Sequence, residues 1–346
     1  MMNRKALLVF LLLEYILMIA ACRLETPVSA PAEISAETKV TILPMSGDIA
    51  QPRAEISGLA WYKDTLVLLP QYPGRFDSSG DGVLFRIQKS QIQAYLGDNS
   101  GTELVPARII LEAPGLIERI PGFEGFEAIA FDGDRVYLTI ESKPGGSMLG
   151  YVVRGEIAPD LSVITLAVDS LEEILPQAKI DNFSDEALLI SSGKVLTFYE
   201  AWGANVNPDA VGHIFDLDLS PSGTWPLENI EYRITDVTST DGSGRFWAIN
   251  YLYPGDEVKL DPAEDELTIL YGEGKTHAET NIVERLVEFR IDGEGVIRTQ
   301  SPPIQLELME NETARNWEGI VRLEPSGFLV VTDQYPETIL GFVPNP

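Results

Sequence analysis

Cysteine and histidine are almost absent from this chain of 346 residues. The single cysteine is Cys22, so the rest of the chain forms no disulfide bond and no thiolate metal site. The two histidines, His213 and His277, are too few and too far apart in sequence to indicate a zinc site. With two histidines, the chain offers few candidates for the histidine of a Ser-His-Asp triad, and no G-x-S-x-G nucleophile elbow occurs.

Basic residues are also scarce, with 25 Lys and Arg against 53 Asp and Glu and a formal net charge of −28. Such a charge repels nucleic acid and anionic lipid headgroups, which excludes both as electrostatic partners. Two explanations remain open for the acidity. It is a solvated surface of a secreted protein, or some carboxylates are placed to bind divalent cations.

Long helical patterns are rare after the N-terminus, whereas short apolar runs between Gly, Pro, Asp and Ser turns are frequent. Hydrophobic residues make up 45% of the chain, which is enough for a large core. These features predict an all-β fold of short strands.

The N-terminus has the pattern of an export signal. Basic residues at Arg4 and Lys5 precede an apolar stretch, and Ile19-Ala20-Ala21-Cys22 resembles the lipobox of bacterial lipoproteins. A membrane anchor helix is the alternative, but the stretch is shorter than the ~20 residues that span a bilayer and contains Glu14. We therefore expect a signal peptide at 1–21, a lipidated Cys22 with a flexible tether at 22–38, and one folded domain at 39–346. The protein would be exported and lipid-anchored to the bacterial cell envelope, on its periplasmic or surface face, touching the membrane only through that lipid.

Five stretches repeat one hairpin pattern, in which a polar residue opens an apolar strand and a Gly, Asp or Ser turn leads to a second strand. Repeats of this length predict a β-propeller. We expect five blades, with six as the alternative, and we expect the strand at 39–43 to pair in the last blade and close the ring. The hairpins lie at 56–69, 127–140, 186–199, 236–249 and 318–332.

The polar residues that open the hairpins should meet on the propeller axis. Four carboxylates repel one another strongly at contact distance, and a bound cation, most simply calcium, resolves the repulsion. The predicted metal ligands are Ser57, Glu127, Glu186, Asp236 and Glu318.

The residues that end the second strands should lie at the same mouth of the channel, because antiparallel strands return there. Glu141, Glu200 and Asp333 are the predicted catalytic carboxylates, each a candidate general base acting on water. The rest of the predicted substrate funnel consists of Gln71, Asn250, Tyr72, Trp202 and Tyr335.

The segments around Glu127, Asp236 and Glu318, in their order along the chain, resemble the phytase-like propeller domain known as "esterase-like activity of phytase". The resemblance covers roughly residues 50 to 344, and it implies an exported β-propeller that carries a hydrolase label. The pattern is also similar to calcium-centred propellers such as apyrase-type nucleotidases and lactonases. Glu127, Glu186, Asp236 and Glu318 match their inward-facing position, whereas Ser57 departs from a carboxylate there.

Two functions stay open from the sequence. One is a calcium-dependent hydrolase of phosphoesters or other esters. The other is a non-catalytic cell-surface propeller that binds a small-molecule or cell-envelope ligand around a structural calcium. A quinone-dependent sugar dehydrogenase is a third alternative, against which the scarcity of histidine counts. We expect a monomer.

Overall fold

The computed structural model describes residues 34–77, 80–98 and 102–346. The predicted signal peptide, Cys22 and the tether up to residue 33 lie outside these residues. Within the described ranges, none of the helices has both the length and the apolar character needed to cross a bilayer.

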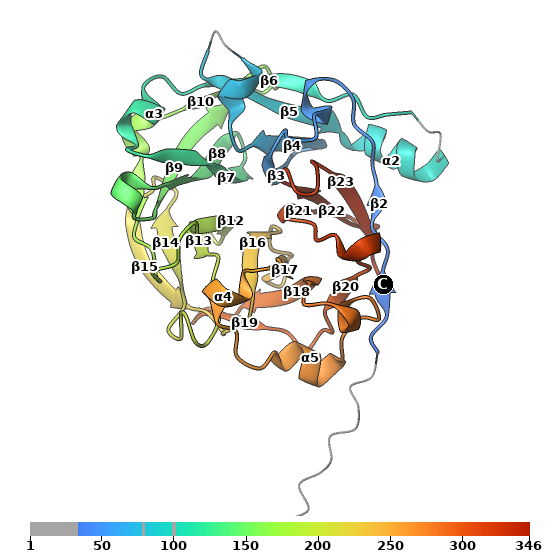
Figure 1. Cartoon of the computed structure of the whole chain (residues 1–346). Coiled ribbons are helices and arrows are strands. Elements are labelled where there is room, and N and C mark those ends of the chain that lie inside the picture. Colours follow the sequence, from blue (N-terminus) through green and yellow to red (C-terminus); the bar gives the residue numbers. More distant parts are fainter. Residues whose placement is uncertain (1–33, 78–79, 99–101) are drawn as a thin grey trace, which may run out of the picture. The chain divides into compact units, whose positions relative to one another are not determined.

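Five blades, each built mainly from antiparallel strands, follow one another around a common centre, as the all-β, five-bladed prediction requires (Figure 1). The first two blades are joined into one sheet by the parallel pairing of β6 (Ala107–Glu112) with β10 (Val163–Leu166), so the described chain forms four hydrogen-bonded sheets. Strands β3, β7, β12, β16 and β21 are the innermost strands, one from each blade (Figure 1). The predicted β-propeller is therefore confirmed, and the innermost strands bring their first residues to one central cavity.

Each blade consists of consecutive strands, and the first three of each blade are ordered from the centre outward. The first blade contains β3 (Ile56–Tyr62), β4 (Thr65–Pro70), β5 (Gly82–Gln88) and β6 (Ala107–Glu112). The second contains β7 (Phe123–Asp132), β8 (Arg135–Ser142), β9 (Leu149–Ile157), β10 (Val163–Leu166) and β11 (Glu172–Ile174). The third contains β12 (Asp185–Ser191), β13 (Lys194–Tyr199), β14 (Val211–Asp216) and β15 (Pro221–Pro226).

The fourth blade contains β16 (Arg233–Val237), β17 (Arg245–Leu252), β18 (Val283–Ile291), β19 (Val296–Arg298) and β20 (Ile304–Leu306). The fifth contains β21 (Trp317–Leu323), β22 (Gly327–Thr332) and β23 (Leu340–Pro344). In the second blade β11 pairs with β9, and in the fourth both β19 and β20 pair with β18. The helices lie in connections between strands and are α2 (Lys89–Asp98), α3 (Leu116–Arg119), α4 (Glu257–Leu260) and α5 (Glu266–Tyr271).

The hydrophobic core is divided among the spaces between neighbouring blades. One cluster, for example, packs Leu66 and Leu68 of β4 against Leu329 and Val331 of β22. Because the sheets are covered on both faces, β4 and β22 are buried along their whole length rather than at alternate residues. This explains the continuous apolar runs in the sequence.

The ring is closed by the N-terminal end of the described chain, as predicted. Strand β2 (Thr41–Ile42) pairs antiparallel with β23, so the last blade takes its outermost strand from the start of the chain. Strand β1 (Glu37–Thr38) pairs parallel with β20 in the fourth blade. Glu37 and Thr38 fall in the predicted tether, and the structure places them in a sheet instead.

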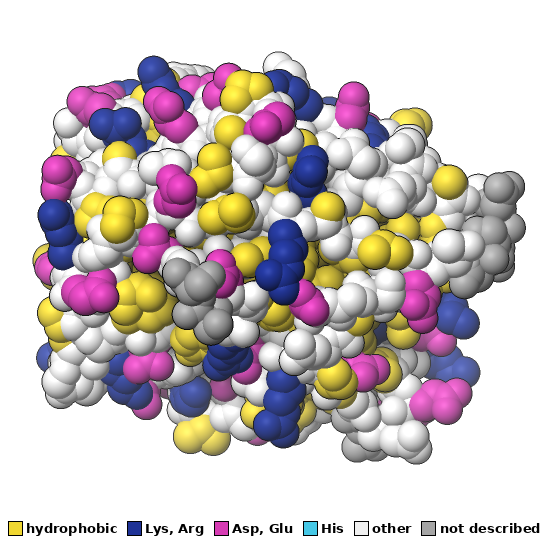
Figure 2. Space-filling view, turned by 90° about the horizontal axis from the view of Figure 1, so that it is seen from above, with side chains coloured by type: hydrophobic (Ala, Val, Ile, Leu, Met, Phe, Trp, Pro, Cys, Tyr) yellow, Lys and Arg dark blue, Asp and Glu magenta, His cyan; other side chains and the backbone are white. Residues whose placement is uncertain are grey.

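On the face that Figure 2 shows, charges of both signs are interspersed. Figure 2 views the molecule from above, and on this face Lys and Arg side chains alternate with Asp and Glu, with single apolar side chains between them. The net charge of −28 therefore does not form one continuous acidic patch on this face.

Candidate functional site

Each innermost strand carries a β-bulge near its start, and the bulge aims a polar side chain at the centre. The register shifts between Ile56 and Gly58 in β3, between Asp185 and Ala187 in β12, and between Trp317 and Gly319 in β21. An extra residue at a bulge leaves the ladder and is re-aimed. The re-aimed residues, Ser57, Glu186 and Glu318, line a central cavity of about 320 Å³ together with Glu127 of β7.

The fourth blade is where the predicted register is wrong. Its bulge lies between Ile234 and Val237 and contains two residues, Thr235 and Asp236. The Thr235 hydroxyl donates to the backbone oxygen of Trp317 at 2.6 Å. The Ser57 hydroxyl makes the same bond, at 2.6 Å, to the backbone oxygen of Phe126 in the second blade. Thr235, not Asp236, is therefore the equivalent of Ser57.

Asp236 does not line the cavity, and this is a correction to its predicted role as a metal ligand. Its carboxylate accepts a hydrogen bond from the backbone N–H of Ile320 at 2.8 Å. A one-residue difference in register moves a side chain to another face of the strand, which explains the error. Burial raises the pKa of Asp236 well above its usual value, although the N–H groups of Ile320 and Val237 oppose the shift.

Replacing Asp236 with alanine should lower the free energy of unfolding by about 1–3 kcal/mol, because the buried N–H of Ile320 loses its acceptor. Urea denaturation measures the loss. Asp236→Asn is the matched control, since an amide oxygen can still accept that bond, and it should stay close to the wild type. A large drop in Asp236→Asn would mean that the charge itself is required.

The ends of the second strands form a second polar ring at the same mouth. Gln71, Glu141 and Asp333 line the cavity, as predicted. Glu200 has no exposed surface and lies deeper. Asn250 is a further correction, because its side chain is buried outside the cavity, where it donates to the backbone oxygens of Glu231 and Arg233.

The residue that occupies the second-ring position in the fourth blade is Tyr251. In the backbone register Tyr251 lies opposite Arg233. Gln71 and Glu200 have the equivalent positions, because their backbone N–H groups donate to the backbone oxygens of Glu55 and Ser184, respectively. The Tyr251 hydroxyl lies 3.3 Å from Glu318 Oε1. The fourth blade thus offers a phenol where the sequence pattern suggested an amide, and both of its predicted site residues are one position off.

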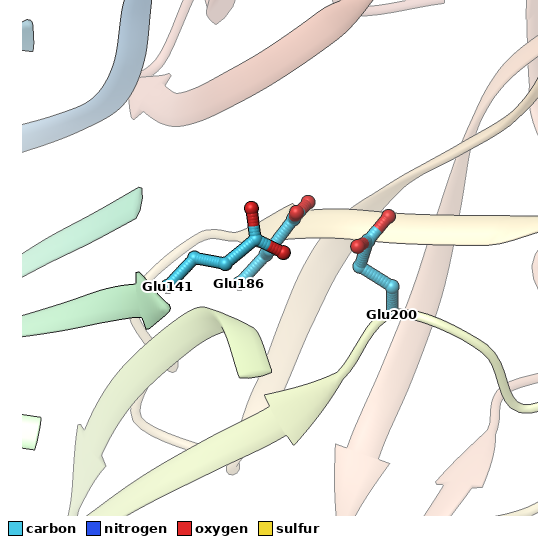
Figure 3. Close-up of side chains that lie close together, drawn as sticks. All are labelled: Glu141, Glu186 and Glu200. Carbon is cyan, nitrogen blue, oxygen red and sulfur yellow. The ribbon is translucent and has the colours of Figure 1, made fainter. Parts of the chain in front are cut away.

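Three glutamates form the tightest group of the cavity. One carboxylate oxygen from each of Glu141, Glu186 and Glu200 lies within 4.8 Å of the others, and all three side chains are buried (Figure 3). Glu141 Oε1 and Glu186 Oε2 have no hydrogen-bond partner among the residues that the structure describes. Buried carboxylate oxygens normally have one. These two oxygens are therefore free to accept a further ligand within the cavity.

Arg233 is the functional residue that the sequence analysis missed. Its guanidinium contacts Glu200 Oε2 at 2.5 Å and lies 3.6 Å from Glu186 Oε2 and 3.5 Å from Asp256 Oδ2. The guanidinium carbon also lies 4.9 Å from the ring centre of Phe183 and 5.1 Å from that of Tyr251. Arg233 is the one cationic residue of the cavity lining within the described chain.

The carboxyl groups hold one another's pKa values high. Burial raises the pKa of Glu141 to about 8, and the Glu200 carboxylate adds to the rise while Arg233 opposes it. Burial first, and then neighbouring carboxylates, raise the pKa values of Glu127 and Glu186 well above the usual range. The pKa of Asp333 rises to about 6, mainly through burial, against the N–H of Tyr335. Glu141 therefore holds a proton at neutral pH unless a cation neutralises it.

The donor set fits calcium. Calcium is bound by six to eight oxygen ligands from carboxylates, amides and water. Glu141, Glu186 and Glu200 offer carboxylate oxygens, two of which are buried without a hydrogen-bond partner in the described part of the chain. The cavity has no sulfur or imidazole ligand within the described chain, which disfavours softer metals.

Aromatic residues stand at the mouth of the cavity. Tyr72 and Tyr335, both predicted, line it together with Tyr253, and the rings of Tyr253 and Tyr335 have centres 6.4 Å apart. Trp202, in contrast, was predicted for the funnel but lies in the core. It has no exposed surface and packs against Phe198 and Phe289, with its indole N–H donating to the backbone oxygen of Tyr199.

Replacing Trp202 with alanine should therefore lower the free energy of unfolding by about 3–5 kcal/mol, the usual cost of truncating a buried aromatic side chain. Tyr335→Ala is the comparison, since that ring is 51% exposed and should change stability far less. Chemical denaturation followed by circular dichroism measures both. A Trp202→Ala protein of unchanged stability would contradict its position in the core.

Both histidines lie outside the cavity. His213 Nδ1 contacts Asp185 Oδ1 at 3.1 Å, and Thr197 donates to the same oxygen. His277 is buried against Glu37 and Glu284 in the insertion that carries α4 and α5. Proton transfer in the cavity would fall to its carboxyl groups.

No family model matches the chain, and no curated protein matches it. Among solved structures, a glucose dehydrogenase is similar at 13% identity and a TM-score of 0.46, over 89% of this chain and 100% of that one. A GH43_1 enzyme from Xanthomonas citri is similar at 10% identity and a TM-score of 0.46, over 88% of this chain and 91% of that one. A β-1,2-mannobiose phosphorylase from Listeria innocua is similar at 12% identity and a TM-score of 0.47, over 88% and 93%. At such identities the likeness assigns no activity to this chain.

Proposed function

We propose that the central cavity binds a divalent cation, most simply calcium, and that the protein is a hydrolase of phosphoesters or other esters. The observation that carries the proposal is the buried group of Glu141, Glu186 and Glu200, in which Glu141 Oε1 has no hydrogen-bond partner within the described chain and Glu186 Oε2 has only the guanidinium of Arg233 near it, at 3.6 Å. Three carboxylates so close together repel one another, and a divalent ion between them replaces repulsion with attraction.

The three glutamates would hold the ion, with Glu127 and Glu318 beside them. Glu141 and Glu200, predicted as catalytic groups, would thus be ligands, because their carboxylates cluster with that of Glu186. When bound, the ion would act as a Lewis acid that polarises the phosphoryl or carbonyl oxygen of the substrate. Arg233 would fix the orientation of Glu200, since its guanidinium holds that carboxylate at 2.5 Å.

Asp333 would serve as the general base. It lines the cavity, is not part of the buried glutamate group and has a pKa of about 6, so it is mostly ionised at neutral pH. In ester hydrolysis it would take one proton from the attacking water. The hydroxide would form a bond to the acyl carbon, the bond to the leaving oxygen would break, and that oxygen would take up the proton.

The experiment is a turnover panel of aryl phosphates, nucleotides, lactones and aryl esters, run with calcium and with a chelator. The proposal predicts calcium-dependent turnover that falls about a hundredfold or more in Asp333→Asn, while the protein stays folded. Asp134→Asn, a surface carboxylate paired with Lys63 far from the cavity lining, is the matched control and should retain full activity. No turnover across the panel at saturating calcium would contradict a hydrolase.

A non-catalytic propeller that binds a ligand around a structural calcium is the second candidate. The observation that favours it is the position of both histidines outside the cavity, which leaves acid–base chemistry to carboxyl groups alone. This function predicts calcium binding and a ligand, but no turnover on the same panel.

Export and lipidation at Cys22 remain part of the proposal and rest on the sequence. The protein would act as a monomer on a small-molecule or cell-envelope ligand, held at the membrane by its N-terminal lipid alone. Detergent phase partitioning of the full chain tests the anchor, since the lipidated protein should enter the detergent phase and Cys22→Ala should not.

A further inference from the structure

The cavity has a strong excess of carboxyl groups over cations. Seven carboxyl residues line it, namely Glu124, Glu127, Glu141, Glu186, Asp256, Glu318 and Asp333, against the single guanidinium of Arg233. Arg233 is already engaged by Glu200, which lies behind the lining. A divalent ion and Arg233 together carry three positive charges, which match the three clustered glutamates. Asp256 also pairs with Lys259, whereas the remaining carboxyl groups of the lining form no ion pair within the described chain, namely Glu124, Glu127, Glu318 and Asp333.

The carboxylates of the lining would therefore repel an anionic ligand even after the cation has bound. The field of fixed like charges in a cleft of low dielectric constant lowers the local concentration of anions. Asp333, with a pKa of about 6, is mostly ionised at neutral pH and lies at the mouth that a ligand has to pass. A phosphate group would bring one or two negative charges to this lining.

The same lining is well suited to hydroxyl groups. The carboxyl groups of Glu127, Glu318 and Asp333 line the cavity and accept hydrogen bonds from hydroxyl groups. Gln71, Asn182, Asn316 and Gln334 add amides that both donate and accept. A hydroxyl group also does both, so a ligand with several hydroxyl groups can satisfy many of these side chains at once.

The rim supplies the complementary apolar surface. Tyr253 and Tyr335 present paired rings at the mouth, and Tyr72 lies on the lining as well. Aromatic rings offer rigid, flat contact area to the C–H-bearing face of a cyclic polyol while their hydroxyl groups remain in water. A few aromatic walls around converging polar groups are the usual features of a small-molecule site.

We propose that the ligand of this cavity is a neutral, polyhydroxylated molecule of the size of a sugar, free or carried as a carboxylic ester, and not a phosphorylated compound. The inference rests on the proposed function and narrows it, because the bond cleaved would be that of a carboxylic ester or lactone. A cavity of about 320 Å³ accommodates one or two sugar rings.

Matched pairs that differ only in a phosphate group test the proposal. The full chain at saturating calcium and pH 7.5 is titrated by calorimetry with glucose, galactose, mannose and arabinose and with a phosphate ester of each. At least one neutral member should bind about tenfold more tightly than its phosphate. Equal or tighter binding of the phosphates would overturn the proposal, and so would the absence of binding by every neutral member.

Variants at the rim separate charge from shape. Glu124→Gln removes one charge from the lining and should raise the affinity for the sugar phosphates, relative to that for the neutral sugars, about threefold or more. Glu118→Gln, in α3 and outside the cavity, is the matched control and should change neither. If Glu124→Gln and Glu118→Gln behave alike, charge in the lining does not select the ligand and the proposal fails.

The failure of this inference is distinguishable from the failure of the proposed function. A neutral sugar that binds without any ester being cleaved would remove the hydrolase and leave the inference standing. If phosphoesters bind and are cleaved and no neutral sugar binds, the hydrolase stands and the inference of a neutral ligand fails.

Discussion

Without divalent cations, the folded protein should lose stability as the pH rises from about 4.5 to about 8. The cause is Glu141, whose pKa burial raises from 4.5 to about 8 with the help of Glu200. Between these two pH values the folded state keeps a proton on Glu141 that the unfolded state has released. The free energy of unfolding therefore falls with rising pH, and the contribution of Glu141 is complete only below the unfolded pKa.

The expected loss is on the order of 3 kcal/mol from Glu141 alone, and Glu127, Glu186 and Glu318 shift in the same direction. Calcium should reverse it, because the ion binds the ionised form. Thermal melting at pH 5 and pH 8, with a chelator and with calcium, measures both effects. The rise in melting temperature on adding calcium should be much larger at pH 8 than at pH 5.

Glu141→Gln is the control for this pH dependence. A neutral amide cannot ionise, so the chelated variant should be more stable than the wild type at pH 8 and should respond less to calcium. A chelated wild type that is equally stable at pH 5 and pH 8 would contradict the buried, mutually repelling carboxyl groups.

Replacing Arg233 with methionine should lower the free energy of unfolding by about 3–5 kcal/mol near neutral pH. Removing one partner of a buried ion pair leaves the other charge uncompensated, and here Glu200 has no exposed surface to recover hydration. The loss of the guanidinium also removes the group that opposes the pKa rise of Glu141, Glu186 and Glu318. The variant should therefore recover part of its stability at pH 5.

The matched control is Arg119→Met, which breaks the exposed pair with Asp169 at 2.8 Å. Exposed pairs contribute about 0–1 kcal/mol, so this variant should be close to the wild type at both pH values. Urea denaturation at pH 5 and pH 7.5 measures the free energy of unfolding of the two variants and of the wild type. Equal losses in both would mean that Arg233 is not the counter-charge of the buried glutamates.

The repeat pattern predicted the fold because each hairpin combines a turn signal with two apolar strands, and the ring requires all five. The pairing of the strand at 39–43 with the last blade could also be predicted, because the outer edge of that blade would otherwise be unpaired. In the structure β2 pairs with β23 at this edge. The division of the core among the spaces between blades follows from the same repeat, as strands buried on both faces read as continuous apolar runs.

Four of the five residues predicted for the first ring line the cavity, and the residue predicted in the fourth blade does not, for a local reason. Ile234-Thr235-Asp236-Val237 offers two polar residues in a row, and the sequence favours the carboxylate because three of the other four blades carry one. The bulge, however, aims the first of the two at the axis, as the matching hydroxyl bonds of Thr235 and Ser57 show. A comparison restricted to the first polar residue after each buried apolar residue would have selected Thr235.

The repeat pattern could predict neither the position of Arg233 at the cavity nor that of Trp202 in the core. The position of Arg233 is occupied by Glu55, Gly125, Ser184 and Asn316 in the other blades, so no repeated residue type marks it. Trp202 follows Glu200 by two residues in an irregular segment, where side-chain direction has no fixed period. Its packing against Phe198 and Phe289 depends on tertiary contacts alone.

Calorimetric titration of the full, metal-free chain with calcium at pH 8 tests the central claim most directly. Binding should be tight in the wild type, at least a hundredfold weaker in Glu186→Gln and unchanged in Asp236→Asn, since only the first of these side chains belongs to the buried glutamate group. Equal binding by the wild type and Glu186→Gln, or no binding by the wild type, would contradict a cation held by Glu141, Glu186 and Glu200.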